Sequence, residues 1–172
     1  MQTLILGGAR SGKSAWAERL ASASGCDVVY VATAQAGDDE MRARIANHRA
    51  RRPAQWSCVE QPLALAATLA AHACVGRVLL VDCLTLWLSN LLHAGEARFE
   101  SERKALLDTL PKLPGELLLV ANEVGLGVVP LGALARRFVD EAGRLNQSVA
   151  AVVERVLFVA AGLPVALKGG LP

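Results

Sequence analysis

A glycine-rich stretch near the start of the chain limits most strongly what this sequence can fold into. Residues 7–14 are Gly-Gly-Ala-Arg-Ser-Gly-Lys-Ser and match the pattern G-x-x-x-x-G-K-[ST]. The apolar run Thr3–Leu6 comes before it and predicts a buried strand, and Ala15–Ala23 follows it and predicts a helix. Between a strand and a helix, such a loop surrounds phosphate oxygens with backbone N–H groups at the positive end of the helix.

The residues of this loop have different expected roles. Lys13 is expected to reach the outer phosphates of a nucleotide, and the Ser14 hydroxyl to bind a magnesium ion. The other members are expected to hold phosphate through their backbone; they are Gly7, Gly8, Ala9, Arg10, Ser11 and Gly12. A fortuitous glycine loop is the alternative, but the flanking strand and helix favour nucleotide binding.

Apolar runs recur along the rest of the chain and predict the fold class. They are Thr3–Leu6, Val28–Ala32, Arg77–Val81, Glu116–Ala121 and Val156–Ala160. Their alternation with segments of helical period predicts an α/β fold with a mostly parallel sheet and helices on both faces. A length of 172 residues with 53% hydrophobic residues fits a single domain, 1–172, with a proper core.

The segments of helical period predict four further helices, at 38–52, 84–93, 98–110 and 131–154. The last of these could be one helix or two, because Gly143 is a weak point within it. The tail 162–168 is expected to add a short edge strand.

Composition narrows the classes of partner. The net charge of +2 gives no reason to expect a polyanion partner for the whole molecule. The four cysteines form no metal-binding pattern, so we expect them to be reduced and mostly buried. The most apolar stretch, 78–92, is interrupted by polar residues and is shorter than the roughly 20 residues of a membrane span. We therefore expect a cytoplasmic protein with no membrane span and no secretory signal.

Polar residues at the carboxyl ends of parallel strands are the first candidates for a site. Asp82 ends the run Val78–Val81 and is expected to hold magnesium; its alternative role is to cap the following helix. Glu123 could bind metal, orient a substrate hydroxyl or act as a base, or it could be an ordinary loop carboxylate. The sequence lacks an N-K-x-D segment, which disfavours a signalling GTPase.

The segment 42–53 places one histidine among five arginines. On a helix, Arg44, His48, Arg51 and Arg52 would share about a third of the circumference. Neighbouring cations favour the neutral, nucleophilic imidazole, and the arginines could neutralise a triphosphate. From the residues alone, a solvated basic face remains the alternative, and nucleic-acid binding has little support because Trp56 is the single aromatic residue nearby.

Several of these segments together resemble one family. They are 7–14, Tyr30–Gln35, Arg44–Pro53 with Trp56 and Glu60, Asp82–Leu92, Asn122–Gly127, Arg144–Gln147 and the segment closing at Lys168. In this order they resemble the bifunctional adenosylcobinamide kinase and adenosylcobinamide-phosphate guanylyltransferase family of cobalamin assembly. The resemblance spans nearly the whole chain, and the arginine-flanked histidine makes it specific.

The resemblance implies two reactions on one corrinoid side chain. In the first, ATP or GTP phosphorylates the hydroxyl of the aminopropanol arm of adenosylcobinamide. In the second, GTP gives GMP to an enzyme histidine, and the new phosphate takes GMP from it to form adenosylcobinamide-GDP. The resemblance also implies a RecA-like, P-loop NTPase-type sheet, a magnesium ion and a homotrimer. No nucleic-acid partner is expected.

The family's functional residues match positions of this sequence. The guanylylated histidine falls on His48. The nucleotide, pyrophosphate or magnesium contacts fall on Thr33, Ala34, Gln35, Arg49, Arg51, Arg52, Glu60 and Asp82. Two other interpretations remain: a plain P-loop small-molecule kinase whose arginine helix is only a lid, and a nucleotide-gated binding protein that touches RNA.

Overall fold

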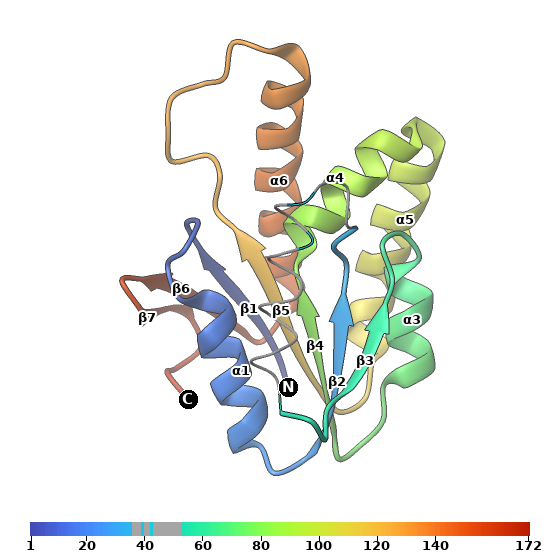
Figure 1. The fold of residues 1–172 in the computed structure, drawn as a ribbon, viewed down its shortest axis with the longest axis vertical. Coiled ribbons are helices and arrows are strands. Elements are labelled where there is room, and N and C mark those ends of the chain that lie inside the picture. Colours follow the sequence, from blue (N-terminus) through green and yellow to red (C-terminus); the bar gives the residue numbers. More distant parts are fainter. Residues whose placement is uncertain (36–38, 40–41, 43–52) are drawn as a thin grey trace.

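Strands alternate with helices along the chain in the computed structural model, which describes residues 1–35, 39, 42 and 53–172 (Figure 1). The strands are β1 (Gln2–Gly7), β2 (Asp27–Ala32), β3 (Ser57–Glu60), β4 (Arg77–Asp82), β5 (Glu116–Asn122), β6 (Arg155–Ala160) and β7 (Leu163–Lys168). The helices are α1 (Lys13–Ala23), α3 (Leu65–His72), α4 (Leu84–Ala94), α5 (Glu96–Thr109) and α6 (Ala133–Val152), with a short 3-10 helix at Leu110–Lys112.

These strands pair into one sheet in the order β3-β2-β4-β5-β1-β6-β7. All the pairings are parallel except that of β7, which runs antiparallel to β6 at the edge. The strand that leads into the glycine-rich loop, β1, therefore has β5 between it and β4, the strand that ends at Asp82. As a result, the glycine-rich loop and Asp82 lie at the same edge of the sheet, two strand positions apart.

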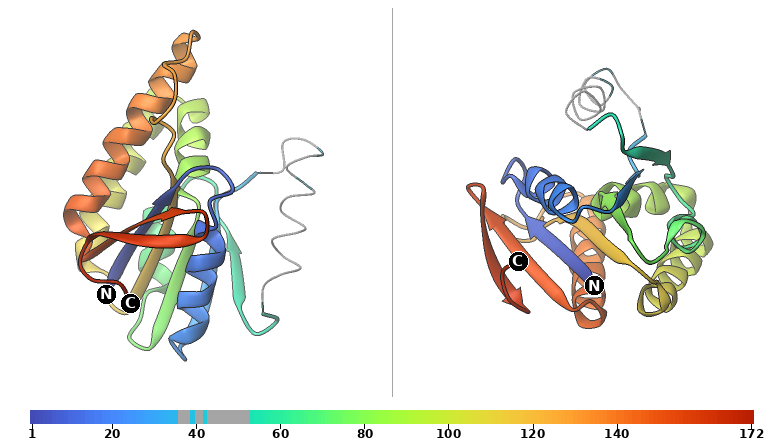
Figure 2. Two further views of the ribbon diagram at one scale, coloured as in Figure 1. Left: turned by 90° about the vertical axis from the view of Figure 1, so that its left-hand side faces the viewer. Right: turned by 90° about the horizontal axis from the view of Figure 1, so that it is seen from below.

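Helices cover both faces of the sheet, as predicted (Figure 2). On one face, α1 packs through Ala17 and Ala21 against alternate residues of the central strands. On the other face, α3, α4, α5 and α6 bury the larger core, with Trp87 of α4 fully buried in it. Because both faces are covered, β4 and β5 are apolar almost throughout rather than alternating.

The five strands predicted from apolar runs and the edge strand in the tail are confirmed. Both β3 and α3 were missed, because β3 is a four-residue edge strand with exposed polar positions and α3 is an alanine-rich helix of eight residues. The segment 131–154 contains one helix, α6, and Gly143 does not interrupt it. The helix predicted at 38–52 lies almost entirely outside the described residues.

The expectation that the cysteines are mostly buried is wrong. None of the four forms a disulfide, but only Cys83 is buried, Cys26 is half-buried, and Cys58 and Cys74 are exposed. Cys58 lies on the edge strand β3 and Cys74 in the turn between α3 and β4, and both positions are at the surface. Within the described ranges, no helix is both long and apolar enough to cross a membrane.

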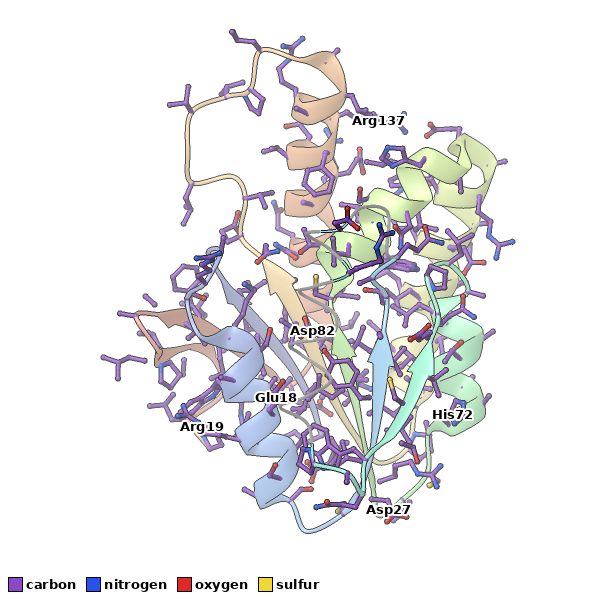
Figure 3. The ribbon with its side chains drawn as sticks, viewed as in Figure 1. Glu18, Arg19, Asp27, His72, Asp82 and Arg137 are labelled. Atoms are coloured by element: carbon purple, nitrogen blue, oxygen red, sulfur yellow. The ribbon has the colours of Figure 1, made fainter. Side chains whose placement is uncertain are left out.

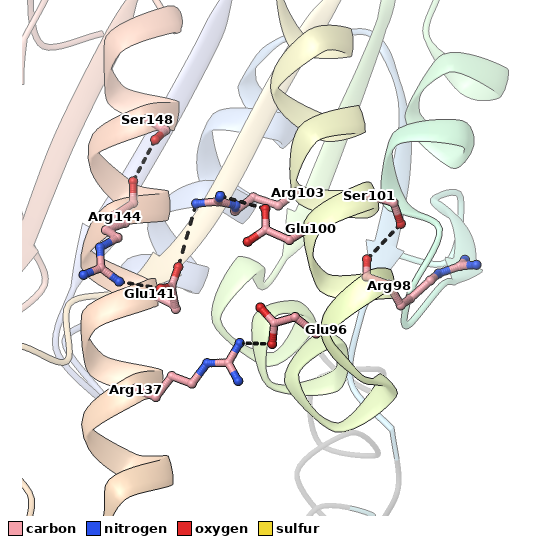
Figure 4. Close-up of polar contacts among 9 residues, drawn as sticks. All are labelled: Glu96, Arg98, Glu100, Ser101, Arg103, Arg137, Glu141, Arg144 and Ser148. Atoms are coloured by element: carbon pink, nitrogen blue, oxygen red, sulfur yellow. Dashed lines mark hydrogen bonds and ion pairs between the residues drawn. The ribbon is translucent and has the colours of Figure 1, made fainter.

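The amino-terminal half of α6 extends beyond the sheet and is held by α5 (Figures 1 and 4). Arg137 of α6 pairs with Glu96 of α5, and Arg103 of α5 lies 3.8 Å from Glu141 of α6. The buried ring of Phe99 lies beneath two guanidinium groups, 5.4 Å from that of Arg103 and 5.5 Å from that of Arg137. These contacts hold the segment between β5 and α6 above the carboxyl edge of the sheet.

Candidate nucleotide-binding site

The loop between β1 and α1 forms a closed turn over the start of the helix. The Lys13 ammonium donates to the Gly8 carbonyl at 2.9 Å, and the Ser11 N–H donates to the same carbonyl at 3.3 Å. From the turn between β6 and β7, the Gly162 N–H donates to the Ser11 carbonyl at 2.8 Å. The loop is thereby braced by a segment from the far end of the sequence.

Two glycines of the phosphate loop, Gly7 and Gly12, are required by the geometry of the loop. A Cβ atom on Gly7 would lie 2.5 Å from the Ser11 Oγ and 2.5 Å from the Val159 carbonyl oxygen, closer than any real contact. Gly12, the residue before α1, has φ +99°, a left-handed conformation that a side chain disfavours. The glycine spacing of the motif therefore has a steric cause in this fold.

Lys13 is held in a low-dielectric position next to acidic groups. Its side chain is buried, and this burial lowers its pKa, while the nearby Cys83 and Asp82 oppose the shift. A desolvated ammonium at the start of α1 is attracted strongly to an incoming phosphate, since water screens it less. Ser14, the next residue, lies half-buried in the first turn of α1.

Asp82 lies at the carboxyl end of β4, facing the side of the sheet that α1 covers (Figure 3). The Tyr30 hydroxyl donates to its Oδ2 at 2.9 Å. The alternative that Asp82 caps the following helix is wrong, because Cys83 is the residue before α4 and no side-chain hydrogen bond caps that helix. The metal-binding interpretation stays a prediction.

Thr33 is fully buried, and its hydroxyl bonds to the backbone of Cys83. It accepts from the Cys83 N–H at 2.9 Å and donates to the Cys83 carbonyl at 2.7 Å. The amide of Asn90 in α4 donates to the Thr33 carbonyl at 2.8 Å and to the Pro62 carbonyl at 3.1 Å. Side chains therefore tie the ends of β2 and β4 and the turn after β3 together; sequence reasoning missed Asn90 and Tyr30.

Glu123 directly follows β5 and lies next to the phosphate loop. Its N–H donates to the Gly7 carbonyl at 3.0 Å, and its Oε1 accepts from the Gly125 N–H at 3.0 Å. The preceding residue, Asn122, donates its N–H to the Thr85 hydroxyl at 2.6 Å. Glu123 is therefore placed at the same edge of the sheet as Lys13, by contacts from β1 and α4.

The other predicted contact residues differ in exposure, and some lie outside the described residues. Ala34 is half-buried and Gln35 exposed just after β2, and Glu60 is exposed at the end of β3, where it pairs in register with Ala32. Arg10 is exposed in the loop with φ +56°. Four predicted site residues lie outside the described residues: His48, Arg49, Arg51 and Arg52.

The described residues fit a magnesium ion that is held together with a nucleotide. They contain no group of three or more His, Cys, Asp or Glu side chains that could hold a metal alone. Magnesium, however, is commonly bound through one or two protein oxygens, with phosphates and water completing its shell. The Ser14 hydroxyl and the Asp82 carboxylate supply such oxygens at one edge of the sheet.

The parallel sheet and its glycine loop define this chain as a P-loop nucleotide-binding protein. Residues 3–167 match the family model described as cobinamide kinase / cobinamide phosphate guanyltransferase. The chain belongs to this family, and the resemblance and enzyme class expected from the sequence are thereby confirmed. The loop at 7–14 and Asp82 both lie within the matched residues.

Curated relatives match over essentially their full length. The bifunctional adenosylcobalamin biosynthesis protein CobP of Pseudomonas aeruginosa is 65% identical over 170 residues, covering 98% of this chain and 98% of that protein. The bifunctional adenosylcobalamin biosynthesis protein CobU of Escherichia coli is 40% identical over 182 residues, covering 98% of this chain and 100% of that protein.

Solved structures share the fold at low sequence identity. The RadB recombinase superposes with a TM-score of 0.51 at 16% identity, covering 91% of this chain and 73% of that chain. The type III secretion ATPase EscN of enteropathogenic E. coli gives a TM-score of 0.52 at 15% identity, covering 92% of this chain and 41% of that chain. These similarities confirm the predicted P-loop NTPase fold class.

Proposed function

We propose that this chain carries out both reactions for which its family is named, with adenosylcobinamide as the substrate of the first and its phosphate as the substrate of the second. The proposal is supported above all by the complete phosphate loop, with the buried Lys13 next to Asp82. The same edge of the sheet presents Glu123, so a nucleotide and an acceptor hydroxyl could meet there.

In the kinase reaction, the oxygen of the aminopropanol hydroxyl attacks the γ-phosphorus of ATP or GTP and the bond to the β-phosphate oxygen breaks. Lys13 and the backbone of residues 7–12 bind the phosphates and disperse their charge. Glu123 is the candidate to accept the proton of the hydroxyl. Its Oε1 accepts from the Gly125 N–H, whereas no hydrogen bond among the described residues involves its Oε2. Ser14 and Asp82 are the side chains that would hold a magnesium ion, which would neutralise charge on the phosphates.

In the guanylyl reaction, the His48 imidazole attacks the α-phosphorus of GTP. A nitrogen–phosphorus bond forms, and the bond to the β-phosphate oxygen breaks to release pyrophosphate. A phosphate oxygen of the corrinoid then attacks the same phosphorus, and the nitrogen–phosphorus bond breaks. Further nucleotide and pyrophosphate contacts are proposed for Ala34, Gln35, Arg49, Arg51, Arg52 and Glu60. Thr33 is fully buried and bonds to the Cys83 backbone, so its proposed part is to hold the strand ends beside the nucleotide rather than to contact it. The support is the family resemblance of Tyr30–Gln35, of Arg44–Pro53 and of Glu60.

The covalent step is tested with GTP labelled on its α-phosphate. Native protein is expected to acquire an acid-labile, alkali-stable label, and His48→Ala none. His93→Ala is the matched control, since His93 is an exposed histidine at the end of α4 and should keep the label. An unlabelled native protein refutes the guanylyl step and leaves a plain P-loop kinase.

The kinase step is tested separately with GTP labelled on its γ-phosphate and adenosylcobinamide. Transfer of label to the corrinoid is expected in native protein and in His48→Ala, and loss of transfer in Lys13→Ala. Binding of RNA with strong salt dependence, without either transfer, would instead favour the nucleotide-gated binding protein.

A homotrimer in the cytoplasm belongs to the same proposal. The segment joining β5 to α6, together with the first turn of α6, supports an assembly, since its large apolar side chains are 60–97% exposed; they are Leu126, Val128, Val129, Leu131 and Leu134. Sedimentation equilibrium tests the trimer, and a monomer at micromolar concentration contradicts it. A cytoplasmic location is proposed because the relatives are named as biosynthetic proteins, and cell fractionation checks it.

A further inference from the structure

Tyr30 of β2 lies where its hydroxyl can orient the carboxylate of Asp82 at the end of β4. Tyr30 is 2% exposed, and its hydroxyl donates to the Asp82 Oδ2 at 2.9 Å. Asp82 is half-buried at the strand end, next to the phosphate loop. A buried tyrosine hydroxyl needs a polar partner, and here that partner is a candidate magnesium ligand.

Strand register explains how this contact arises. β2 and β4 are parallel neighbours, with Tyr30 opposite Leu80 and Ala32 opposite Asp82. Tyr30, Leu80 and Asp82 therefore lie on the same face of the sheet, because side chains alternate along a strand. The tyrosine leans toward the carboxyl edge by the rise of two strand residues, about 6.6 Å, a distance its side chain can cover.

The ring of Tyr30 contributes to core packing, whereas its hydroxyl contacts Asp82. The ring packs in the core cluster under α1, among residues such as Val28 and Leu80, where phenylalanine would fill the same space. The hydroxyl adds a directional contact to one oxygen of the carboxylate. Among the described residues, no hydrogen bond reaches the other oxygen, Oδ1.

A second contact fixes the backbone on which Asp82 sits. The Thr33 hydroxyl binds both the N–H and the carbonyl of Cys83, the next residue. β2 and Thr33, the residue that follows it, therefore position this acid twice: Thr33 holds the backbone next to it and Tyr30 holds its carboxylate. With Oδ2 occupied by a hydroxyl from within the sheet, Oδ1 is the oxygen left for a ligand at the edge.

We propose that Tyr30 is a positioning residue that orients the Asp82 carboxylate for the magnesium–nucleotide complex, an inference that rests on the proposed metal role of Asp82. Tyr30 itself does not contact the nucleotide. By holding one oxygen, it makes Asp82 a single-oxygen ligand with a fixed direction, either to the ion or to one of its waters. Loss of such an outer contact typically weakens metal binding by about 10-fold or more.

The test is manganese binding measured by the electron paramagnetic resonance of free Mn²⁺, with native protein saturated by a non-hydrolysable GTP analogue. Tyr30→Phe is expected to weaken Mn²⁺ binding by about 10-fold. Its affinity for the analogue in EDTA should match native protein, because the phosphate loop is unchanged. Thermal unfolding confirms that the variant is folded, and Thr68→Ala, which removes a hydroxyl from α3, is the control that keeps native Mn²⁺ affinity.

Asp82→Asn and the double variant Tyr30→Phe/Asp82→Asn distinguish the metal role of Asp82 from the positioning role of Tyr30. If Asp82→Asn binds Mn²⁺ like native protein, the proposed metal role of Asp82 is wrong. If Asp82→Asn weakens binding and Tyr30→Phe does not, only the positioning role is overturned. The positioning role also requires that Tyr30→Phe has no further effect in the Asp82→Asn background; a full additional loss there refutes it.

Discussion

Replacing Thr33 with valine removes the hydroxyl that joins β2 to the start of α4. Valine has nearly the same shape as threonine, and Thr33 is fully buried, so no water can replace the lost contacts. The Cys83 carbonyl still accepts a hydrogen bond from the Trp87 N–H at 3.1 Å, whereas the Cys83 N–H has no other partner among the described hydrogen bonds. One buried donor is thus left unpaired.

The expected loss of stability follows from these contacts. An unpaired buried N–H costs about 1–3 kcal/mol, and the lost bond to the carbonyl about 0.5–1.5 kcal/mol. Together, Thr33→Val should lower the free energy of unfolding by about 2–4 kcal/mol. For a chain of this length, each kcal/mol corresponds to about 2–4 °C, so the melting temperature should fall by about 4–16 °C.

Thr33→Ser is the matched control, because it keeps the hydroxyl and removes only a methyl group. Its expected cost is about 1 kcal/mol. Urea unfolding followed by circular dichroism measures both variants against native protein. Equal losses for valine and serine would show that the methyl group, not the hydrogen-bond pair, is what matters at Thr33, and the reasoning would be refuted. GTP affinity should follow the same order, since the valine variant loosens the backbone beside Asp82.

Three further predictions concern the loop, the α5–α6 contact and the thiols. Gly7→Ala should weaken GTP binding by roughly 10-fold or more, measured by calorimetry, because its Cβ would overlap a backbone oxygen at 2.5 Å; native affinity would contradict this. Phe99→Ala should cost about 3–5 kcal/mol in urea unfolding, and Glu96→Gln less than about 1 kcal/mol because its ion pair with α6 is largely exposed; similar losses would argue against a packing role for Phe99. Iodoacetamide at pH 8 should modify the exposed Cys58 rapidly and spare Cys83, whose burial raises its pKa to about 11; mass spectrometry showing equal labelling of the folded protein would refute this.

The sequence alone was sufficient for the parts of this protein that depend on local patterns. The phosphate loop could be predicted because its glycines, Lys13 and Ser14 are contiguous, and the structure shows why Gly7 and Gly12 are needed. Central strands such as β4 could be predicted because a buried parallel strand is an uninterrupted apolar run. The family could be identified because its motifs occur in order along nearly the whole chain.

Some elements carried too little local signal. The strand β3 exists because its backbone pairs with β2, not because Ser57–Glu60 has a strand pattern. For α3, the spacing of Leu65 and Leu69 could have indicated a buried helical stripe, but the helix is short. Cys58 and Cys74 are exposed because of where their elements lie in the fold, which residue type does not determine.

Only the tertiary structure decided which distant residues act on one another. Strand order places β5 between the loop strand and β4, and so brings Glu123 beside Gly7. Register between β2 and β4 brings the Tyr30 hydroxyl to Asp82, across 52 positions of sequence. Hydrophobic patterns indicate which segments are buried, but the same pattern fits any choice of neighbouring strand, so it does not indicate which strands pair. Pairing is set by the packing of the whole sheet, and it is pairing that turns Tyr30 from a core aromatic residue into a partner of the site.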